Sequence, residues 1–501
     1  MISRLFAQHI ATEFPHDFTP LQAEAVVTIG DFLSDPRTDQ AFILRGYAGT
    51  GKTSLVAAVV RVWRRLERPV VLLAPTGRAA KVFSQHAGLP AYTIHKVIYR
   101  QDSFNGEDTL FRKGWNASKE ALFIVDEASM VSNQGGNSIF GTGMLLDDLI
   151  EFVYAGLGCR LMFVGDTAQL PPVGEDDSPA LQADILRSYG LHVRMAELTE
   201  VVRQTESSSV LHNATRLRQH IGLHGSFGLN PHDGASEEHQ VNENGWPLIS
   251  VGEKSEVRVM PGDELIEALE TSYRNWGTHD TIVVTRSNKR ANIYNNGIRS
   301  RIFDREDPLT RGDLIMAVKN NYFWIAQAAA GLSEGETIPM SFVANGDCAE
   351  VVAFRNVHEM HGFEFADATL RFTDYDDYEL DCRILLRTLQ SESPSLTADE
   401  SKRLYDAVYA DYADIKNKRE RMKAIRNDPY YNALQIKYAY AVTCHKAQGG
   451  QWHEVYVDQG YIPDETDPIA YLRWLYTAFT RTSANLYLVN WPKAQTIERT
   501  S

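Results

Sequence analysis

Eight residues early in the chain, 46–53, match the phosphate-binding loop G-x-x-x-x-G-K-[ST] without a mismatch. The apolar run 41–44 before them predicts a buried strand, and 54–60 after them predicts a helix, which is the context that this motif needs. Glycines let several backbone N–H groups at a helix N-terminus point at phosphate oxygens. Lys52 would reach the β and γ phosphates, and the Thr53 hydroxyl would hold Mg²⁺. The residues expected around the phosphates are Gly46, Ala48, Gly49, Thr50, Gly51, Lys52 and Thr53.

Two further polar segments follow apolar runs and complete a hydrolytic site. Asp126 and Glu127 come directly after the run 122–125. We expect Asp126 to contact Mg²⁺ through its outer shell and Glu127 to polarise the attacking water. Gln169 follows the run 161–164 and can bond the γ-phosphate or the attacking water. The sequence therefore predicts a nucleoside triphosphatase, and the open question is what hydrolysis drives.

Composition favours a globular protein of several domains. The chain has 501 residues, of which 44% are hydrophobic. At about 150 residues per domain this length indicates roughly three domains. No apolar run approaches the roughly 20 residues that cross a membrane, and the first residues lack the apolar segment of a secretory signal. We therefore expect a cytoplasmic protein without a membrane partner. The cysteines lack zinc-site spacing and are expected to be buried thiols: Cys159, Cys348, Cys382 and Cys444.

The net charge of −15 argues against indiscriminate nucleic-acid binding, because phosphate contacts need Lys and Arg. It leaves room for a groove of local positive charge. Two basic clusters are present, and for each a solvated helix face is favoured over a DNA contact. They are Arg61, Arg64, Arg65 and Arg68, and then Lys416, Lys418, Arg419, Arg421, Lys423 and Arg426.

Short apolar runs alternate with helical segments in two parts of the chain. Such runs are typical of parallel strands that are buried on both faces. Polar segments follow several of them, at the place where ligands bind in open α/β sheets. The first set is 41–44, 70–74, 122–125 and 161–164, and the second set is 281–284, 438–442, 455–457 and 486–489.

The region from about 308 to 428 interrupts the second set and has a different pattern. Apolar and polar residues alternate at 368–372 and at 380–384, which predicts a small antiparallel barrel. A helix should follow, opened by the capping box of Thr397 and Glu400. Its apolar face would carry Leu404, Val408, Tyr412 and Ile415.

Seven segments in order make the chain recognisable: GYAGTGKT, APTGRAAK, TIHK, DEAS, GDTAQLPPV, TCHKAQG and YTAFTR. Together, and with compatible spacing, they resemble superfamily 1 DNA helicases, and within them the RecD-like and Dda-like group of superfamily 1B. The resemblance covers nearly the whole chain.

This resemblance implies an α/β fold of two RecA-like (P-loop NTPase) parallel-sheet domains with ATP in the cleft between them. It also implies a small hairpin insertion in the first domain and an SH3-like β-barrel insertion in the second. The expected limits are 1–185 for the first domain with its pin-like insertion at about 96–120, 186–307 and 431–501 for the two parts of the second, and 308–430 for the barrel with a helical elaboration.

The resemblance also implies roles for residues that the motifs alone would not single out. Gln22 is similar to a glutamine that pairs with the adenine edge. Arg203 and Arg481 resemble arginines that reach the γ-phosphate from the second domain, where they stabilise charge in the transition state. Gln448 and Gly449 are expected to contact the nucleotide.

Contacts to single-stranded DNA should come from hydroxyls, amides and ring N–H groups that bind the backbone without distinguishing bases. The resemblance places them at Thr76, Thr93, His95, Asn288, Lys289, Thr443 and His445. A strand-separating pin is expected between Tyr99 and Trp115, where Asn105-Gly106 forms a favoured hairpin turn. Phe104 beside this turn could stack on the last base pair, and an ordinary surface loop is equally consistent with these residues.

The sequence thus predicts an ATP-dependent DNA helicase that uses ATP and Mg²⁺, tracks on single-stranded DNA and opens forked duplex DNA. The resemblance implies 5′-to-3′ movement. The alternative is an ATP-gated single-strand translocase or nucleoprotein remodeller that does not unwind duplexes. RNA remains open as the track, because backbone contacts need not sense the 2′-hydroxyl. The loop 135–143 is rich in glycine and lacks Lys and Arg, so a second phosphate site is not expected there.

Overall fold

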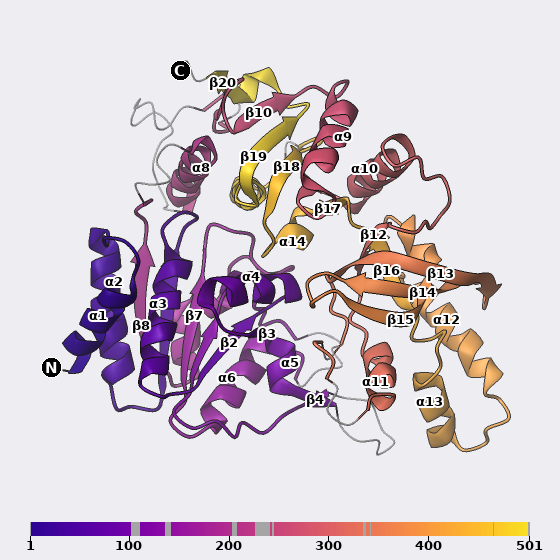
Figure 1. The fold of residues 1–501 in the computed structure, drawn as a ribbon, viewed down its shortest axis with the longest axis horizontal. Helices are drawn as coiled ribbons and strands as arrows, with labels where there is room; N and C mark the ends of the chain where they lie inside the picture. Colours follow the sequence, from indigo (N-terminus) through magenta and orange to yellow (C-terminus); the bar gives the residue numbers. More distant parts are fainter. Residues whose placement is uncertain are drawn as a thin grey trace.

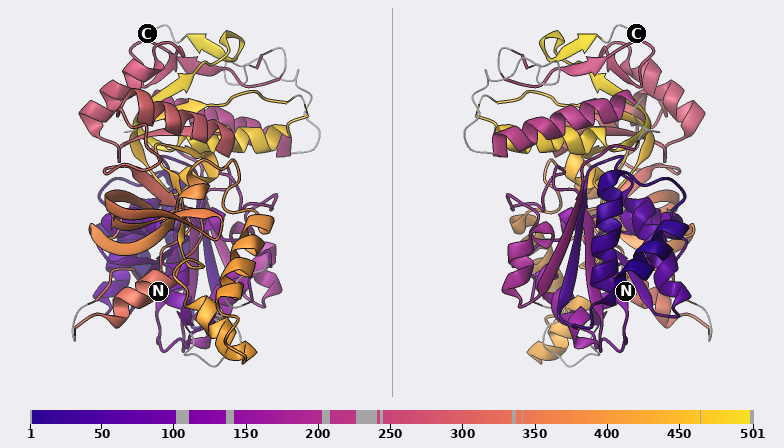
Figure 2. Two further views of the ribbon diagram at one scale, coloured as in Figure 1. Left: turned by 90° about the vertical axis from the view of Figure 1, so that its right-hand side faces the viewer. Right: turned by 90° about the vertical axis from the view of Figure 1, so that its left-hand side faces the viewer.

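The computed structural model describes residues 2–101, 111–135, 142–202, 208–225, 241–242, 245–333, 337–340, 342–463 and 465–498. Two parallel sheets and a closed barrel form three blocks, with the first sheet at the lower left of Figure 1, the second above it and the barrel at the right. The side views in Figure 2 show the second block stacked over the other two. This arrangement confirms the predicted fold class of two parallel-sheet units with a barrel.

The first sheet has six strands in the order β3-β2-β6-β7-β1-β8, and each neighbouring pair is parallel. All four apolar runs predicted for this part of the chain form strands. The strands are β1 (Gln40–Gly46), β2 (Val70–Ala74), β3 (Ala91–Thr93), β6 (Leu122–Val125), β7 (Arg160–Gly165) and β8 (His192–Leu198).

Both faces of this sheet are buried, because successive side chains of a strand point to opposite faces. On β1, Phe42 and Leu44 pack with one set of helices, whereas Ala41 and Ile43 pack with another. The first set is α1 (Ile2–Glu13), α2 (Pro20–Ser34), α3 (Lys52–Arg65) and α4 (Gly77–Ala87), and the second is α5 (Ile94–Ile98), α6 (Leu145–Ala155) and α7 (Ala183–Ser188).

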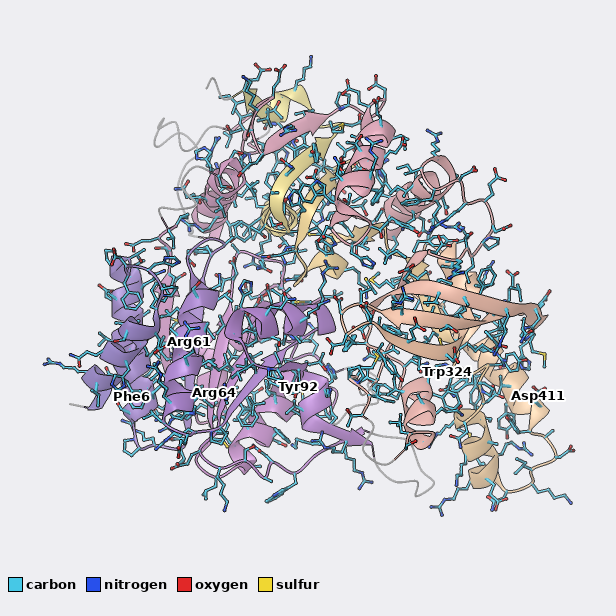
Figure 3. All side chains as sticks on the ribbon, viewed as in Figure 1. Phe6, Arg61, Arg64, Tyr92, Trp324 and Asp411 are labelled. Carbon is cyan, nitrogen blue, oxygen red and sulfur yellow. The ribbon has the colours of Figure 1, made fainter. Side chains whose placement is uncertain are left out.

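One predicted basic cluster lies on α3 and serves packing within the first block. Arg61 and Arg65 both form ion pairs with Glu13 of α1, and the Arg61 Nε atom lies 3.3 Å from the carboxylate. Figure 3 shows Arg61 and Arg64 on the side of the molecule away from the barrel. These contacts agree with the expectation that this cluster is a helix face and not a DNA contact.

The second sheet has five parallel strands in the order β10-β19-β18-β11-β17. The predicted run 438–442 is not a single strand. Tyr438 ends a barrel strand, the chain then turns, and β17 begins at Ala441. The turn is held by the Tyr440 hydroxyl, which accepts a hydrogen bond from the Leu314 N–H at 3.0 Å. The elements are α8 (Ser209–Gly225), β10 (Val257–Met260), α9 (Leu265–Trp276), β11 (Thr281–Thr285), α10 (Asn288–Arg301), β17 (Ala441–Thr443), α14 (Cys444–Ala447), β18 (Trp452–Asp458), α15 (Pro468–Phe479) and β19 (Thr482–Val489).

The inserted region forms a closed barrel of five strands. The capping box of Thr397 and Glu400 is present, but the single helix predicted after it is wrong: α12 ends at Asp411 and a separate helix is capped by Asn417. The apolar face predicted for one helix therefore does not continue past α12. Arg421 donates to the carbonyls of Ala413 and Ile415 in the turn between the two helices. The elements are β12 (Leu314–Ala317), α11 (Phe323–Ala330), β13 (Cys348–Met360), β14 (Phe363–Phe372), β15 (Tyr378–Leu385), α12 (Ala398–Asp411), α13 (Lys418–Arg426) and β16 (Leu434–Tyr438).

A short antiparallel pair, β4 (Tyr99–Gln101) and β5 (Phe111–Lys113), forms the base of the predicted pin. Phe104 and the turn beside it lie outside the described residues, as does Arg203. A second short pair is parallel and joins β9 (Ile249–Val251) to β20 (Thr496–Glu498). The domain limits predicted from the sequence stay a prediction. No helix in the described ranges is both long and apolar enough to cross a membrane.

A buried ion-pair network joins the barrel to the second sheet. Asp313, which is fully buried just before β12, accepts two hydrogen bonds of 2.9 Å from the guanidinium of Arg299 on α10. It also accepts from Arg305 at 3.0 Å and from the Tyr440 hydroxyl at 3.2 Å. One carboxylate therefore pairs with two arginines at the point where the chain enters the barrel.

We predict that Asp313→Asn destabilises the protein by about 3–5 kcal/mol, because the change leaves a buried arginine without its counter-ion. Urea unfolding followed by circular dichroism measures the effect. Asp184→Asn is the control, since Asp184 pairs with Arg187 on the surface and its side chain is 93% exposed. The control should leave the unfolding midpoint unchanged, and an equally stable Asp313→Asn protein would contradict the assigned role of the network.

Candidate nucleotide and nucleic-acid sites

The phosphate loop lies between the end of β1 at Gly46 and the start of α3 at Lys52. Gly49 and Gly51 have φ angles of 76° and 77°, which favour glycine. A Cβ atom at Gly51 would also lie 2.7 Å from the Gln22 amide nitrogen. The Lys52 ammonium donates a hydrogen bond of 2.8 Å to the Tyr47 carbonyl, so the loop is folded around its own lysine.

A cavity of about 590 Å³ lies above this loop, between the first and second sheets. Its lining comes from four sequence motifs of the first block and from two motifs of the second block. The predicted nucleotide-site residues that line it are Ala48, Gly49, Gly51, Lys52, Thr53, Asp126, Glu127, Gln169, Gly449 and Arg481. Gly46, Thr50, Gln22 and Gln448 lie behind this lining.

Two carboxylates face the phosphate loop from the end of β6. The Asp126 carboxylate accepts a hydrogen bond of 2.9 Å from the Glu127 N–H, and Glu127 itself has a left-handed φ of 51°. Burial and the neighbouring Glu127 carboxylate raise the pKa of Asp126, while Lys52 opposes the shift. A cation beside Asp126 would therefore favour its charged form.

The donors present fit Mg²⁺. Thr53 and Asp126 offer hard oxygen atoms on the same cavity, and Mg²⁺ commonly takes one or two protein groups together with phosphate oxygens and waters. Among the described residues no cluster of three or more His, Cys, Asp or Glu side chains could hold a metal. The site thus suits a metal that arrives with a nucleotide.

Gln22 is buried and its amide is used within the protein. Its nitrogen donates a hydrogen bond of 2.9 Å to the Thr50 carbonyl, and its oxygen accepts one of 3.0 Å from the Thr19 N–H at the start of α2. The side chain therefore ties α2 to the phosphate loop. Its predicted contact with adenine stays a prediction.

Two glutamines lie on the other side of the cavity, and one of them connects the sheets. Gln448 donates a hydrogen bond of 2.7 Å to the Leu170 carbonyl, so it fixes the segment that carries Gln169. The Gln169 side-chain oxygen is buried and has no hydrogen-bond partner among the described residues. Because buried acceptors are nearly always satisfied, this oxygen is suited to accept from a water in the cavity.

Arg481 enters the cavity wall from the end of α15. It is 3% exposed, and its guanidinium donates to the carbonyls of Thr477 at 2.9 Å and Gly450 at 3.2 Å. The arginine is therefore positioned by its own domain while it faces the phosphate loop of the other. That placement agrees with the expected arginine of the second domain, whose role stays a prediction.

Tyr476 and Asp166 are site residues that the sequence reasoning missed. The buried Tyr476 hydroxyl donates to the Asp166 carboxylate at 2.6 Å and accepts from the Ala48 N–H at 2.9 Å. Thr477 beside it accepts from the Leu170 N–H at 2.8 Å. The available signal was position: Asp166 follows β7 just as Asp126 follows β6.

The residues expected to bind DNA in the first block lie after neighbouring parallel strands. Thr76 follows β2 and caps α4, where its hydroxyl accepts from the Ala79 N–H at 3.2 Å. Thr93 follows β3 and caps α5 in the same way. His95 lies half-buried beside Phe342, and burial lowers the pKa of His95 to about 4. A contact from His95 would therefore be a neutral hydrogen bond.

The corresponding residues of the second block also lie at the carboxyl edge of its sheet. Thr443 ends β17 and is paired in register with Thr285 of β11, after which α10 begins at Asn288. His445 and Lys289 are both exposed, and Lys289 forms an ion pair of 3.5 Å with Glu392. The carboxyl edges of the two sheets thus carry all seven of the described candidates, as the resemblance implies.

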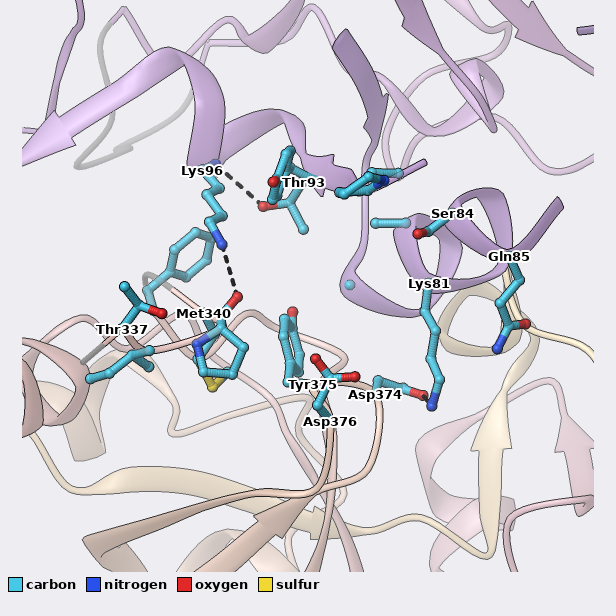
Figure 4. Close-up of a pocket in the computed structure, with 18 residues that line it drawn as sticks. Lys81, Ser84, Gln85, Thr93, Lys96, Thr337, Met340, Asp374, Tyr375 and Asp376 are labelled. Carbon is cyan, nitrogen blue, oxygen red and sulfur yellow. Dashed lines mark hydrogen bonds and ion pairs between the residues drawn. The ribbon is translucent and has the colours of Figure 1, made fainter. Parts of the chain in front are cut away.

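A second cavity of about 700 Å³ lies between α4, β3 and loops of the barrel (Figure 4). Lys96 spans it, with its ammonium 2.8 Å from the Pro339 carbonyl and 4.8 Å from the centre of the Tyr92 ring. Lys81 reaches the Thr373 carbonyl of the barrel at 2.7 Å. Lys81 also forms an ion pair of 3.4 Å with Asp374, and Asp376 lines the same cavity, so carboxylates offset the charge of its two lysines.

Comparison with known proteins gives two domain matches. The family described as an AAA domain matches residues 20–223, and the UvrD-like helicase C-terminal domain matches residues 438–489. The two matches lie on the two sides of the 590 Å³ cavity.

Three relatives extend these matches. The uncharacterised protein R530 of Acanthamoeba polyphaga mimivirus is 22% identical over 90% of this chain and 95% of its own length. The ATP-dependent RecD2 DNA helicase of Deinococcus radiodurans is 30% identical over 36% of this chain and 22% of its own length. The ATP-dependent DNA helicase dda of Enterobacteria phage T4 is 24% identical over 54% of this chain. The chain spans 55% of the phage protein, so it covers only part of either helicase.

Among solved structures, a Pif1 helicase from Bacteroides in complex with ADP-AlF3 and ssDNA aligns over 97% of this chain and 95% of that chain. Its sequence identity is 15% and its TM-score is 0.45. A likeness at that level does not bear on function.

We predict that Lys52→Ala reduces ATP hydrolysis to below about 1% of wild type, because the ammonium that neutralises the β and γ phosphates is lost. Steady-state phosphate release measures this. Lys402→Ala, on the exposed face of α12, is the control and should keep full activity. Substantial turnover by Lys52→Ala would refute the assignment of the phosphate loop.

We predict that Glu127→Gln binds nucleotide normally but loses about 10²–10⁴-fold in turnover, since an amide cannot act as a general base. Binding is followed with a fluorescent ATP analogue and turnover by phosphate release. Near-normal turnover would show that another group activates the water.

Proposed function

We propose that this chain, a superfamily 1B helicase in the light of its two domain matches and its relatives, uses ATP and Mg²⁺ to move along single-stranded DNA and to unwind forked duplex DNA. The observation that carries the proposal is the two-sided wall of the nucleotide cavity. Lys52, Asp126 and Glu127 stand on the first sheet, and Arg481 stands on the second.

Hydrolysis should depend on the separation of the two sheets. An arginine from one domain stabilises transition-state charge on a phosphate held by the other only when the cleft is closed. Each cycle of binding and release would then open and close the cleft, and the movement would shift the two carboxyl edges relative to each other. Threonines on the two edges would then bind the DNA strand alternately, so that the protein moves along it in steps.

Single-stranded DNA is proposed as the track for two reasons. RecD2 and dda are both named DNA helicases, and the candidate contacts on this chain are hydroxyls, ring N–H groups, one amide and one ammonium, which can bind phosphates without distinguishing bases. Direction is proposed as 5′-to-3′ from the resemblance in sequence. An RNA track is a second outcome that the same assays distinguish.

Strand separation needs an element beside the exit of the strand. The β4–β5 pair supports such a pin in the first block. The alternative function, an ATP-gated translocase or remodeller that does not unwind, would hold if Phe104, which lies outside the described residues, does not act on the duplex.

We predict that single-stranded DNA raises the ATPase rate about tenfold or more, because a withdrawn arginine costs about 10³–10⁵ in kcat. An oligonucleotide titration at low, stated salt measures the effect, since phosphate-dominated binding weakens steeply with salt. An RNA oligonucleotide of the same sequence is the comparison. A flat ATPase rate under conditions where binding is observed would reject the coupling.

We predict that a forked substrate with a 5′ tail is unwound and that the matched 3′-tailed substrate is not. Strand release under single-turnover conditions with ATP reports unwinding and polarity together. Release from the 3′ tail alone would reverse the proposed direction. DNA-stimulated ATPase without release from either substrate would favour the translocase.

A further inference from the structure

Tyr476 occupies a point where the two sheets meet the phosphate loop. It lies on α15 of the second block and is 1% exposed. Its hydroxyl contacts two separate segments of the first block: the Ala48 N–H at 2.9 Å and the Asp166 carboxylate at 2.6 Å. One hydroxyl therefore uses its acceptor and its donor to join three parts of the chain.

The acceptor contact engages a group that the phosphate loop needs for its ligand. Ala48 lines the nucleotide cavity, and N–H groups of such loops bind phosphate oxygens. A phosphate oxygen carries charge, so it is a stronger acceptor than a neutral phenol. A phosphate oxygen that reached this N–H would therefore displace the neutral hydroxyl.

The donor contact keeps the hydroxyl in place and protonated. Burial raises the pKa of Tyr476 well above its ordinary value, so the proton stays on the phenol and points to Asp166. The Asp166 carboxylate is itself fixed by a hydrogen bond of 2.9 Å from the Ala168 N–H. Loss of the Ala48 contact therefore leaves Tyr476 with one partner instead of two.

The position of Tyr476 along α15 links this contact to the arginine. The Arg481 guanidinium donates to the Thr477 carbonyl, and Thr477 is also docked on the Leu170 N–H. The last turn of α15 thus carries the tyrosine that contacts the phosphate loop and the carbonyl that orients the arginine. A shift of that turn must move both.

We propose that Tyr476 is a positioning residue that acts as a latch: its hydroxyl holds the Ala48 N–H while the nucleotide site is empty and gives it up when a nucleoside triphosphate binds. This inference rests on the proposed function. Because the hydrogen bond to Ala48 must break first, the latch weakens nucleotide binding by the free energy of that bond. Its release removes one of the three contacts that hold the last turn of α15, which orients Arg481, against the first block. The ligand class that opens it is a nucleotide phosphate.

The test compares Tyr476→Phe with Tyr471→Phe in the full chain. Tyr471 is the matched control, because it is buried on the same helix and its hydroxyl binds Gln459 within its own block. The dissociation constant of a fluorescent, non-hydrolysable ATP analogue is measured with Mg²⁺ and without DNA. Tyr476→Phe should bind about two- to tenfold more tightly, the range of one net hydrogen bond, and Tyr471→Phe should match wild type.

Tighter binding separates a latch from a merely structural tyrosine, whose loss would weaken binding or leave it unchanged. Either of those results overturns the proposal, as does equal tightening in the control. If Tyr476→Phe does not fold, 3-fluorotyrosine is placed at 476 instead and its ¹⁹F resonance is followed during titration with the analogue. A resonance that moves to saturation supports the latch, and one that stays fixed overturns it.

The failure of the latch is distinct from a failure of the proposed function. If wild type binds the analogue but neither hydrolyses ATP nor unwinds DNA, the proposed function fails, and the affinities still decide the latch. If wild type is an active helicase and the two variants bind alike, the latch alone fails.

Discussion

Burial of parallel strands on both faces is the constraint from which the other features follow. Helices cover the two sides of the first sheet, so central strands such as β6 and β7 are buried along their length and functional polar groups gather where those strands end. Asp126, Asp166 and the phosphate loop all occupy such ends. In the second sheet the carboxyl edge pairs Thr443 with Thr285, shortly before α10 begins at Asn288. Catalytic and strand-binding groups are therefore gathered by topology before any specific contact forms.

The interface between the sheets combines apolar packing, in which Ala168 and Leu170 join the core of the second block, with directional polar contacts. Arg78 of α4 stacks on the Trp452 ring at 4.0 Å and donates to the Gln451 carbonyl at 3.0 Å. Gly449 lies so close to the first block that a Cβ there would be 3.1 Å from Ala79. Directional contacts of this kind can break and re-form, whereas a continuous apolar interface resists opening. The cleft is thus suited to a cycle of closure and release.

The sequence predicted local features well and distant contacts poorly. The phosphate loop, its strand and its helix are encoded within about two dozen adjacent residues, so pattern alone locates them. The contact of Tyr476 with Asp166 joins residues 310 positions apart, and nothing local to either residue announces it. The prediction of one strand at 438–442 was wrong, because apolar composition cannot show where a chain leaves a barrel and enters a sheet. The hydrogen bonds of the Gln22 amide to Thr50 and Thr19 were likewise not evident from the sequence, while its contact with adenine stays a prediction.

The barrel's attachment has a mechanical consequence. Asp313 and its two arginines clamp the barrel to the second block, while Lys81 and Lys96 of the first block touch it through loop carbonyls. A rotation of the second block must therefore carry the barrel with it as a rigid arm. Such a rotation would change the walls of the 700 Å³ cavity, because that cavity lies between α4 and the loops of the barrel.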